Sequence, residues 1–111
     1  MQYALLIYGE EGRWEQLSEA EQQAMTEEYM AISRDPKTKG GADLGDLSKA
    51  TTVRVDNGKT LTTDGPFAET KEAIGGFYLV DCASREEALE LAARVPQSPG
   101  VAVEVLKVAE F

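Results

Sequence analysis

The sequence predicts a single α+β domain over residues 1–111, and three features support this prediction. Two segments with the spacing of amphipathic helices lie at about 19–34 and 85–95. An Asn-Gly pair at 57–58, between two runs rich in Thr and Val, indicates a β-hairpin. Short apolar runs of strand type complete the pattern: 3–8, 76–82 and 101–108. This order is typical of a ferredoxin-like βαββαβ arrangement with an added β-hairpin.

Both predicted helices begin with a capping box, in which a serine and a glutamate three residues later satisfy each other's backbone N–H groups. The pairs are Ser18 with Glu21 and Ser84 with Glu87. The first helix should end at Arg34 before Pro36, and the second at Val95 before Pro96. The residues expected to face the core are Ala24, Met25, Tyr29 and Ile32 in the first helix, and Ala88, Leu89, Ala92 and Val95 in the second.

The middle of the chain is less clearly patterned. Residues 36–50 hold either a short strand around Ala42–Leu47 or only loop. A two-residue hairpin loop would place Asp56 opposite Lys59, whereas a three-residue loop would place Val53 opposite Leu61. The second register is favoured because it pairs apolar with apolar side chains.

Composition excludes several classes of function. The net charge is −9, and the 11 basic residues are scattered, so we expect no direct binding to nucleic acid. The longest apolar runs are far too short to cross a membrane, and we expect neither a membrane association nor a signal peptide. The single cysteine, Cys82, indicates a reducing, cytoplasmic location and reads as a buried core thiol with a raised pKa. Because the chain lacks histidine, it offers no cluster of imidazole or thiolate ligands, and we predict no metal and no cofactor.

The predicted central strands are apolar on both faces. Two helices cover only one face of a four-stranded sheet, and an exposed apolar face of that size is rare in monomers. A second copy of the same sheet is the simplest cover. The sequence therefore predicts that the partner of this chain is itself, in a homodimer with sheets packed face to face.

The stretch "TTVRV...TDGPFAETKEAIGGFYLVD", followed by "EEALELAARVP", resembles the YCII-related family in its DGPF-motif branch. The resemblance covers nearly the whole chain and implies a dimeric α/β barrel of bacterial type. Some relatives in this family look like small enzymes with a suggested Asp–His pair, and others are linked to alternative sigma factors. The aspartate of that pair corresponds to Asp64, but this chain has no histidine to serve as its partner.

The candidate site centres on the DGPF motif, residues 64–67. A turn alone explains Asp64-Gly65-Pro66, since aspartate often opens a turn by accepting backbone N–H groups. The functional alternative is a catalytic Asp64, acting as a general acid or base if it is buried beside Phe67. The further ligand-binding candidates are Tyr8, Trp14, Phe67, Thr70, Lys71 and Glu72. Lys71 and Glu72 have a solvated surface as their alternative interpretation. The Gly75-Gly76 pair permits close approach of a neighbouring strand or of a ligand, and packing is the favoured interpretation.

Three functions follow as alternatives. The first is a homodimer that binds a small molecule in a cleft near the DGPF motif, with weak or vestigial chemistry at Asp64. The second is a non-catalytic accessory protein in sigma-factor-linked transcriptional control. The third is an isomerase or lyase that uses Asp64 with Lys71 or Tyr8 in place of histidine. The sequence does not decide whether the protein is an enzyme.

Overall fold

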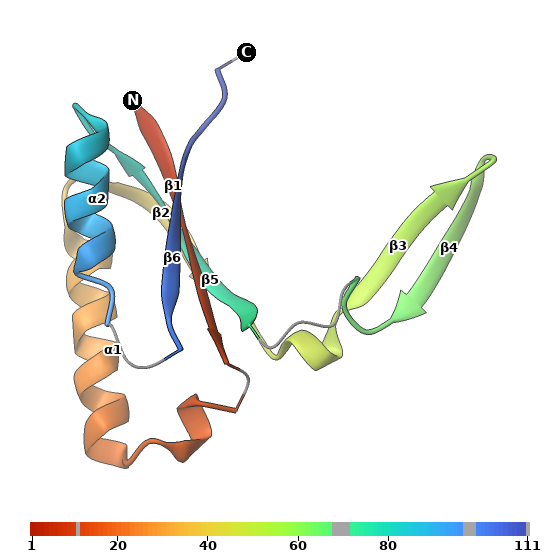
Figure 1. Ribbon diagram of the computed structural model, residues 1–111, viewed down its shortest axis with the longest axis horizontal. Helices are drawn as coiled ribbons and strands as arrows, with labels where there is room; N and C mark the ends of the chain where they lie inside the picture. Colours follow the sequence, from red (N-terminus) through yellow and green to blue (C-terminus); the bar gives the residue numbers. More distant parts are fainter. Residues whose placement is uncertain (11, 68–71, 97–99, 111) are drawn as a thin grey trace.

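The computed structural model describes residues 1–10, 12–67, 72–96 and 100–110. Within them lies a mixed α+β fold whose main sheet is antiparallel and has the strand order β2-β5-β1-β6. This order is consistent with a ferredoxin-like arrangement. The strands are β1 (Gln2–Glu10), β2 (Thr38–Asp43), β5 (Glu72–Asp81) and β6 (Ala102–Lys107). The helices α1 (Glu19–Arg34) and α2 (Arg85–Ala93) lie on one face of this sheet, as Figure 1 shows.

The first capping box forms as predicted. Ser18 Oγ accepts from the Glu21 N–H at 3.2 Å, and Glu21 Oε1 accepts from the Ser18 N–H at 3.1 Å. At α2, Ser84 Oγ accepts from the Glu87 N–H, but the Glu87 carboxylate accepts from Ala83 rather than from Ser84. The prediction that α2 reaches Val95 was wrong, since the helix ends at Ala93.

The core lies between the helices and one face of the sheet. Alternate side chains of the central strands are fully or almost fully buried: Tyr3, Leu5, Ile7, Tyr78 and Val80. From the helix side they meet Ile32, Ala88, Leu91 and Ala92, together with Cys82 and Val95. Leu89, which we expected in this stripe, is 37% exposed, and Leu91 takes the buried place. Ala24 is also exposed, because the N-terminal half of α1 leaves the sheet.

Burial raises the pKa of the Cys82 thiol, with a smaller contribution from Glu87, which agrees with the prediction of a core thiol. Among the described residues, no helix is long and apolar enough to cross a bilayer.

In the part of the chain that the structure describes, no helix covers the second face of the sheet (Figure 1). The strand register places alternate side chains of the central strands on this open face: Ala4, Leu6, Tyr8, Phe77, Leu79, Glu104 and Leu106. Leu79 is 37% exposed and Leu106 51% exposed, so one chain does not enclose this apolar surface.

A separate two-stranded hairpin follows β2 and a short 3₁₀ segment, η2 (Leu47–Lys49). It consists of β3 (Thr51–Asp56) and β4 (Lys59–Asp64). Asn57 and Gly58 form a two-residue loop with φ angles of 50° and 75°. The favoured three-residue loop was wrong: Asp56 lies opposite Lys59, and Arg54 rather than Val53 lies opposite Leu61. The right-handed twist of paired strands favours the tight turn with two positive φ angles, and this outweighs apolar pairing in an exposed hairpin.

Candidate functional site

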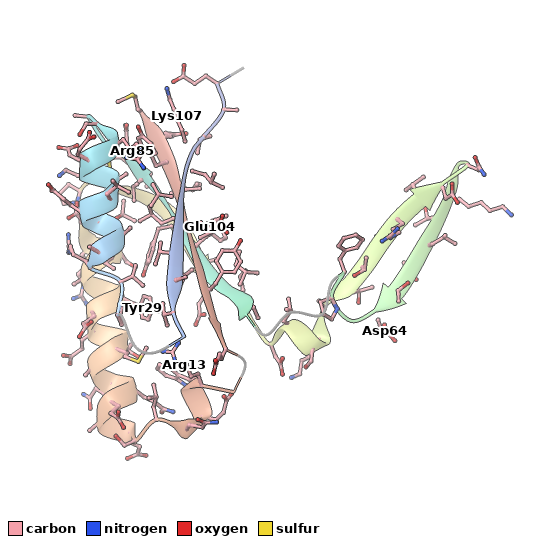
Figure 2. The ribbon with its side chains drawn as sticks, viewed as in Figure 1. Arg13, Tyr29, Asp64, Arg85, Glu104 and Lys107 are labelled. Carbon is pink, nitrogen blue, oxygen red and sulfur yellow. The ribbon has the colours of Figure 1, made fainter. Side chains whose placement is uncertain are left out.

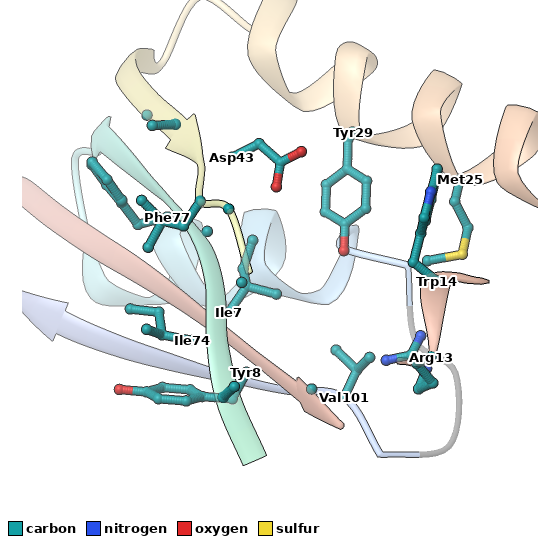
Figure 3. Close-up of a pocket in the computed structure, with 18 of the residues that line it drawn as sticks. Ile7, Tyr8, Arg13, Trp14, Met25, Tyr29, Asp43, Ile74, Phe77 and Val101 are labelled. Carbon is teal, nitrogen blue, oxygen red and sulfur yellow. The ribbon is translucent and has the colours of Figure 1, made fainter. Parts of the chain in front are cut away.

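A cleft opens between the sheet and the part of α1 from Met25 to Ser33, with a volume of about 1220 Å³. It forms because α1 buries only Ile32 fully, near its C-terminal end, so the earlier turns do not close onto the sheet. A 3₁₀ turn, η1 (Trp14–Gln16), closes one end. Figure 3 shows the apolar wall, to which Ile7, Trp14, Met25 and Val101 contribute.

Tyr29 projects from α1 into this cleft, as Figure 3 shows. Burial raises the pKa of the Tyr29 phenol, nearby Tyr78 and Asp43 raise it further, and Arg13 opposes the shift. Tyr29 is therefore a neutral hydroxyl at physiological pH, able both to donate and to accept a hydrogen bond. Its own backbone carbonyl accepts from the Tyr78 hydroxyl at 3.0 Å, which fixes this part of α1 over β5.

Among the charged residues that line the cleft, Arg13 and Asp43 lie on opposite sides of Tyr29 (Figure 3). Arg13 precedes η1, and Asp43 is the last residue of β2. Gly9 leaves room for the arginine, because a Cβ at that position would lie 3.0 Å from Arg13 Nη1. Lys39 and the acidic residues Glu10, Glu15 and Asp46 also line it, so the cleft combines an apolar wall with groups of both charges. Small-molecule sites commonly combine an apolar wall with polar groups that fix the orientation of the ligand.

The Gly75-Gly76 pair shapes the floor of the cleft. The register of β1 with β5 shifts between Ile7 and Tyr8, which pair with Gly76 and Ile74, so Gly75 is the additional residue of a β-bulge. A Cβ on Gly76 would lie 2.9 Å from the Ala42 carbonyl oxygen. The close approach of β2 therefore requires glycine there, which confirms the packing explanation for Gly76.

The predicted site residues do not all come together. Tyr8 and Trp14 both line the cleft. The Tyr8 hydroxyl hydrogen-bonds the Glu104 carboxylate, which raises the pKa of Tyr8. In Figure 3 this hydroxyl points away from Tyr29. Tyr8 thus borders the cleft from β1, and its side chain belongs to the open face of the sheet.

The DGPF motif lies elsewhere. Asp64 ends β4 on the projecting hairpin and is exposed, as Figure 2 shows. Phe67 is 73% exposed, and its ring lies 4.6 Å from Arg54 Cζ, against the hairpin. Neither residue lines the cleft in one chain. Thr70 and Lys71 lie outside the described residues, and for Glu72 only the backbone pairing with Glu10 is described.

Sequence reasoning missed two residues of the cleft. Tyr29 was assigned to the helix stripe as a core residue, and Asp43 fell in the least patterned segment. The available signal was the hydroxyl of Tyr29, since a tyrosine on an apolar stripe needs a polar environment for its end. In the described part of the chain, no group of three or more metal-ligating side chains comes together.

Comparison with known proteins agrees with this fold. The family model of the YCII-related domain matches residues 1–111. An uncharacterised protein of Rhizobium meliloti (strain 1021), R00369, is 41% identical over 96 residues, which cover 83% of this chain and 77% of that protein. The chain therefore belongs to the YCII-related family.

Proposed function

We propose that this protein is a homodimer that binds a small organic molecule in the cleft between α1 and the sheet. The observation that carries the proposal is the cleft itself, which combines a volume of about 1220 Å³ with an apolar wall and polar groups that include Tyr29, Arg13 and Asp43. Ligand sites are usually concave and mostly apolar, with a few polar groups that fix orientation.

The polar groups define the class of ligand. The Tyr29 hydroxyl is neutral, Arg13 supplies a positive charge, and Asp43 accepts hydrogen bonds. A molecule with an apolar ring or chain and an oxygen-bearing head group fits this combination. Small organic acids and lactones are members of that class, with the acid or carbonyl oxygen placed towards Arg13 and Tyr29.

The open face of the sheet supports the dimer. It presents Leu6, Phe77, Leu79 and Leu106 around the charged side chain of Glu104. A contiguous apolar face of this kind is uncommon on monomers and typical of interfaces. A second copy would meet it with an identical surface, as two-fold symmetry requires.

Catalysis at Asp64 stays a prediction. In one chain the carboxylate is exposed on the hairpin, so the burial that acid–base chemistry would need has to come from a second copy. An isomerase or lyase activity would also need a second group in place of histidine, and Tyr8 is the described candidate, although Glu104 engages its hydroxyl.

Thermal-shift measurements against a panel of organic acids and lactones test the binding proposal. We expect members of the panel to raise the melting temperature of the wild type. Tyr29→Phe should reduce that shift, since it removes the hydroxyl and keeps the ring. Tyr3→Phe is the matched control, because Tyr3 lies in the core outside the cleft, and its ligand-induced shift should equal that of the wild type.

Two outcomes separate the candidate roles. If Asp64→Asn leaves every ligand shift unchanged, binding does not involve Asp64. If no ligand stabilises the wild type, the small-molecule proposal fails and the accessory role leads. The projecting hairpin favours that second role, because it offers exposed apolar side chains for contact with another protein.

A further inference from the structure

Within the described residues, nothing covers the β3–β4 hairpin. Its apolar side chains are Val53, Val55 and Leu61, which are 58%, 70% and 51% exposed, with Phe67 beside them at 73%. They occupy both faces of the ribbon, since Val53 and Val55 lie on one face and Arg54 and Leu61 on the other. A two-stranded hairpin alone is marginally stable in water, so this element needs a surface to pack against.

We propose that the hairpin is an arm that packs against a second copy of this chain and receives the same contact in return. The inference rests on the proposed homodimer and adds a second, separate contact to it. The arm comprises residues 51–67, which include the DGPF motif.

The direction of the arm favours a second copy as its partner. Figure 1 shows the hairpin on the side of the sheet opposite to α1 and α2, which is the side that the open face looks towards. A copy docked on the open face would therefore lie beside the hairpin. In a two-fold dimer each hairpin then contacts the other subunit, so both arms are covered at once.

The area that a stable dimer buries also favours a contribution from the hairpin. Four strands of 6 to 10 residues at the usual spacing make a plane of roughly 500 Å². A standard interface takes about 800 Å² from each partner. A hairpin with two exposed faces adds to the area that the open face supplies and brings the contact closer to this size.

Charge also suits this contact. The whole chain has a net charge of −9, so two copies repel each other. Residues 51–67 carry Arg54 and Lys59 against Asp56 and Asp64, a net charge of zero. The arm is thus a neutral segment of an acidic chain, and its Arg54–Phe67 stack, with 4.6 Å between Cζ and the ring centroid, pairs two residue types that are enriched in interfaces.

The proposed arm contact explains why the DGPF motif lies away from the cleft. Phe67 and Asp64 do not line the cleft of their own subunit, because they extend with the hairpin. As part of the arm they lie at the contact between subunits, where Phe67 is an anchor and Asp64 closes the base of the hairpin opposite Thr51.

Sedimentation of point variants over a concentration series tests the arm. We expect the double variant Val55→Asp, Phe67→Asp to raise the dimer Kd at least tenfold, with an unchanged far-UV circular dichroism spectrum. The matched control is Val55→Ile, Phe67→Leu, which keeps apolar bulk and should associate like the wild type. Leu106→Asp, on the open face, should also raise Kd and reports on the face contact alone.

The outcomes are distinguishable. If Leu106→Asp separates the subunits and the arm variant associates like the wild type, the arm is wrong and the dimer of the proposed function stands. If the wild type is monomeric at about 100 μM, far above typical dimer constants, both are wrong. If the arm and Leu106 variants both weaken association, both stand.

Hydrogen exchange supplies an independent readout. Amides of Thr51–Asp64 should exchange slowly at concentrations above the dimer Kd and quickly below it. Protection that does not change across that range would overturn the arm. A version with residues 51–64 replaced by two glycines should keep the main sheet, because the Gly65 N–H donates to the Ala50 carbonyl at 2.7 Å and the two ends are already adjacent. We expect its Kd to match that of the double arm variant.

Discussion

At Gly41 the backbone of β2 lies so close to that of β5 that the sheet has no room for a single additional side-chain atom. A Cβ at that position would lie 2.5 Å from the Phe77 carbonyl oxygen and 3.2 Å from Tyr78 Cα. These neighbours belong to β5, the strand that joins β2 to the rest of the sheet. Since both are backbone atoms, no change of rotamer relieves the contact.

Gly41→Ala should therefore destabilise the fold by about 2–3 kcal/mol, in the range of overpacked positions. Gly45→Ala is the matched control, because a Cβ on Gly45 meets nothing within 4 Å. Urea unfolding of both variants checks the expectation. Equal stabilities for the two variants would contradict the close approach of β2 and β5.

At the scale of elements, Asp35 joins three of them. It follows α1, accepts from the Lys37 N–H at 2.9 Å just before β2, and pairs with Arg94 after α2 at 2.7 Å. The Lys37 backbone bond and then Arg94 lower the pKa of Asp35 below its ordinary value of 3.8. The stability that this carboxylate contributes is thus present above about pH 4 and is lost as pH falls through the lowered folded-state pKa.

Asp35→Asn should consequently reduce the change in stability between pH 7 and about pH 3, because the amide does not titrate. The wild type should lose more stability over this interval than the variant. Glu90→Gln, on the exposed side of α2, should keep the wild-type difference. Chemical unfolding at the two pH values measures this effect, and identical pH dependence of Asp35→Asn and the wild type would exclude it.

The elements with local signals were the ones that the sequence predicted best. The bounds of α1 follow from Ser18, Glu21 and Pro36, which act within one turn of the helix ends. The hairpin register was wrong because turn geometry, rather than the side chains across the strands, decides an exposed pair. Strand β2 begins at Thr38, earlier than the predicted Ala42, because two glycines allow a close approach that hydropathy does not reveal.

Only some of the cleft residues could be predicted from the sequence, because the rest depend on tertiary packing. Tyr8 and Trp14 were found because they follow the pattern of strand ends and loops. The gap at α1 depends on how the whole helix tilts over the sheet, and no local pattern encodes that tilt. The sequence identified the DGPF motif as unusual, but its position on a projecting hairpin required the structure.

For the molecule as a whole, Glu104 is the charge that the proposed dimer has to accommodate. It lies on the open face opposite Leu6 and accepts from the Tyr8 hydroxyl. Covering the face removes water from this carboxylate, which is costly without a compensating cation.

Glu104→Gln should tighten the dimer about tenfold, since the amide oxygen keeps an acceptor for Tyr8 and the charge is gone. Glu90→Gln again serves as the control for a change in net charge and should leave Kd unaffected. Sedimentation equilibrium provides the measurement. Weaker association of Glu104→Gln would mean that Glu104 meets a cation across the contact.

The exposed apolar surface of the hairpin also has a consequence for the turnover of the protein inside a cell. Until a newly synthesised copy dimerises, the exposed apolar arm is accessible to proteases and to unrelated aggregation-prone chains. The rate of dimer formation falls with the square of the protein concentration, whereas the rate of degradation falls only in proportion to it. At low concentration most copies would therefore be degraded as monomers, and at high concentration most would survive as dimers. The arm would therefore make the lifetime of the protein depend on its rate of synthesis, so that the protein persists only where enough of it is produced.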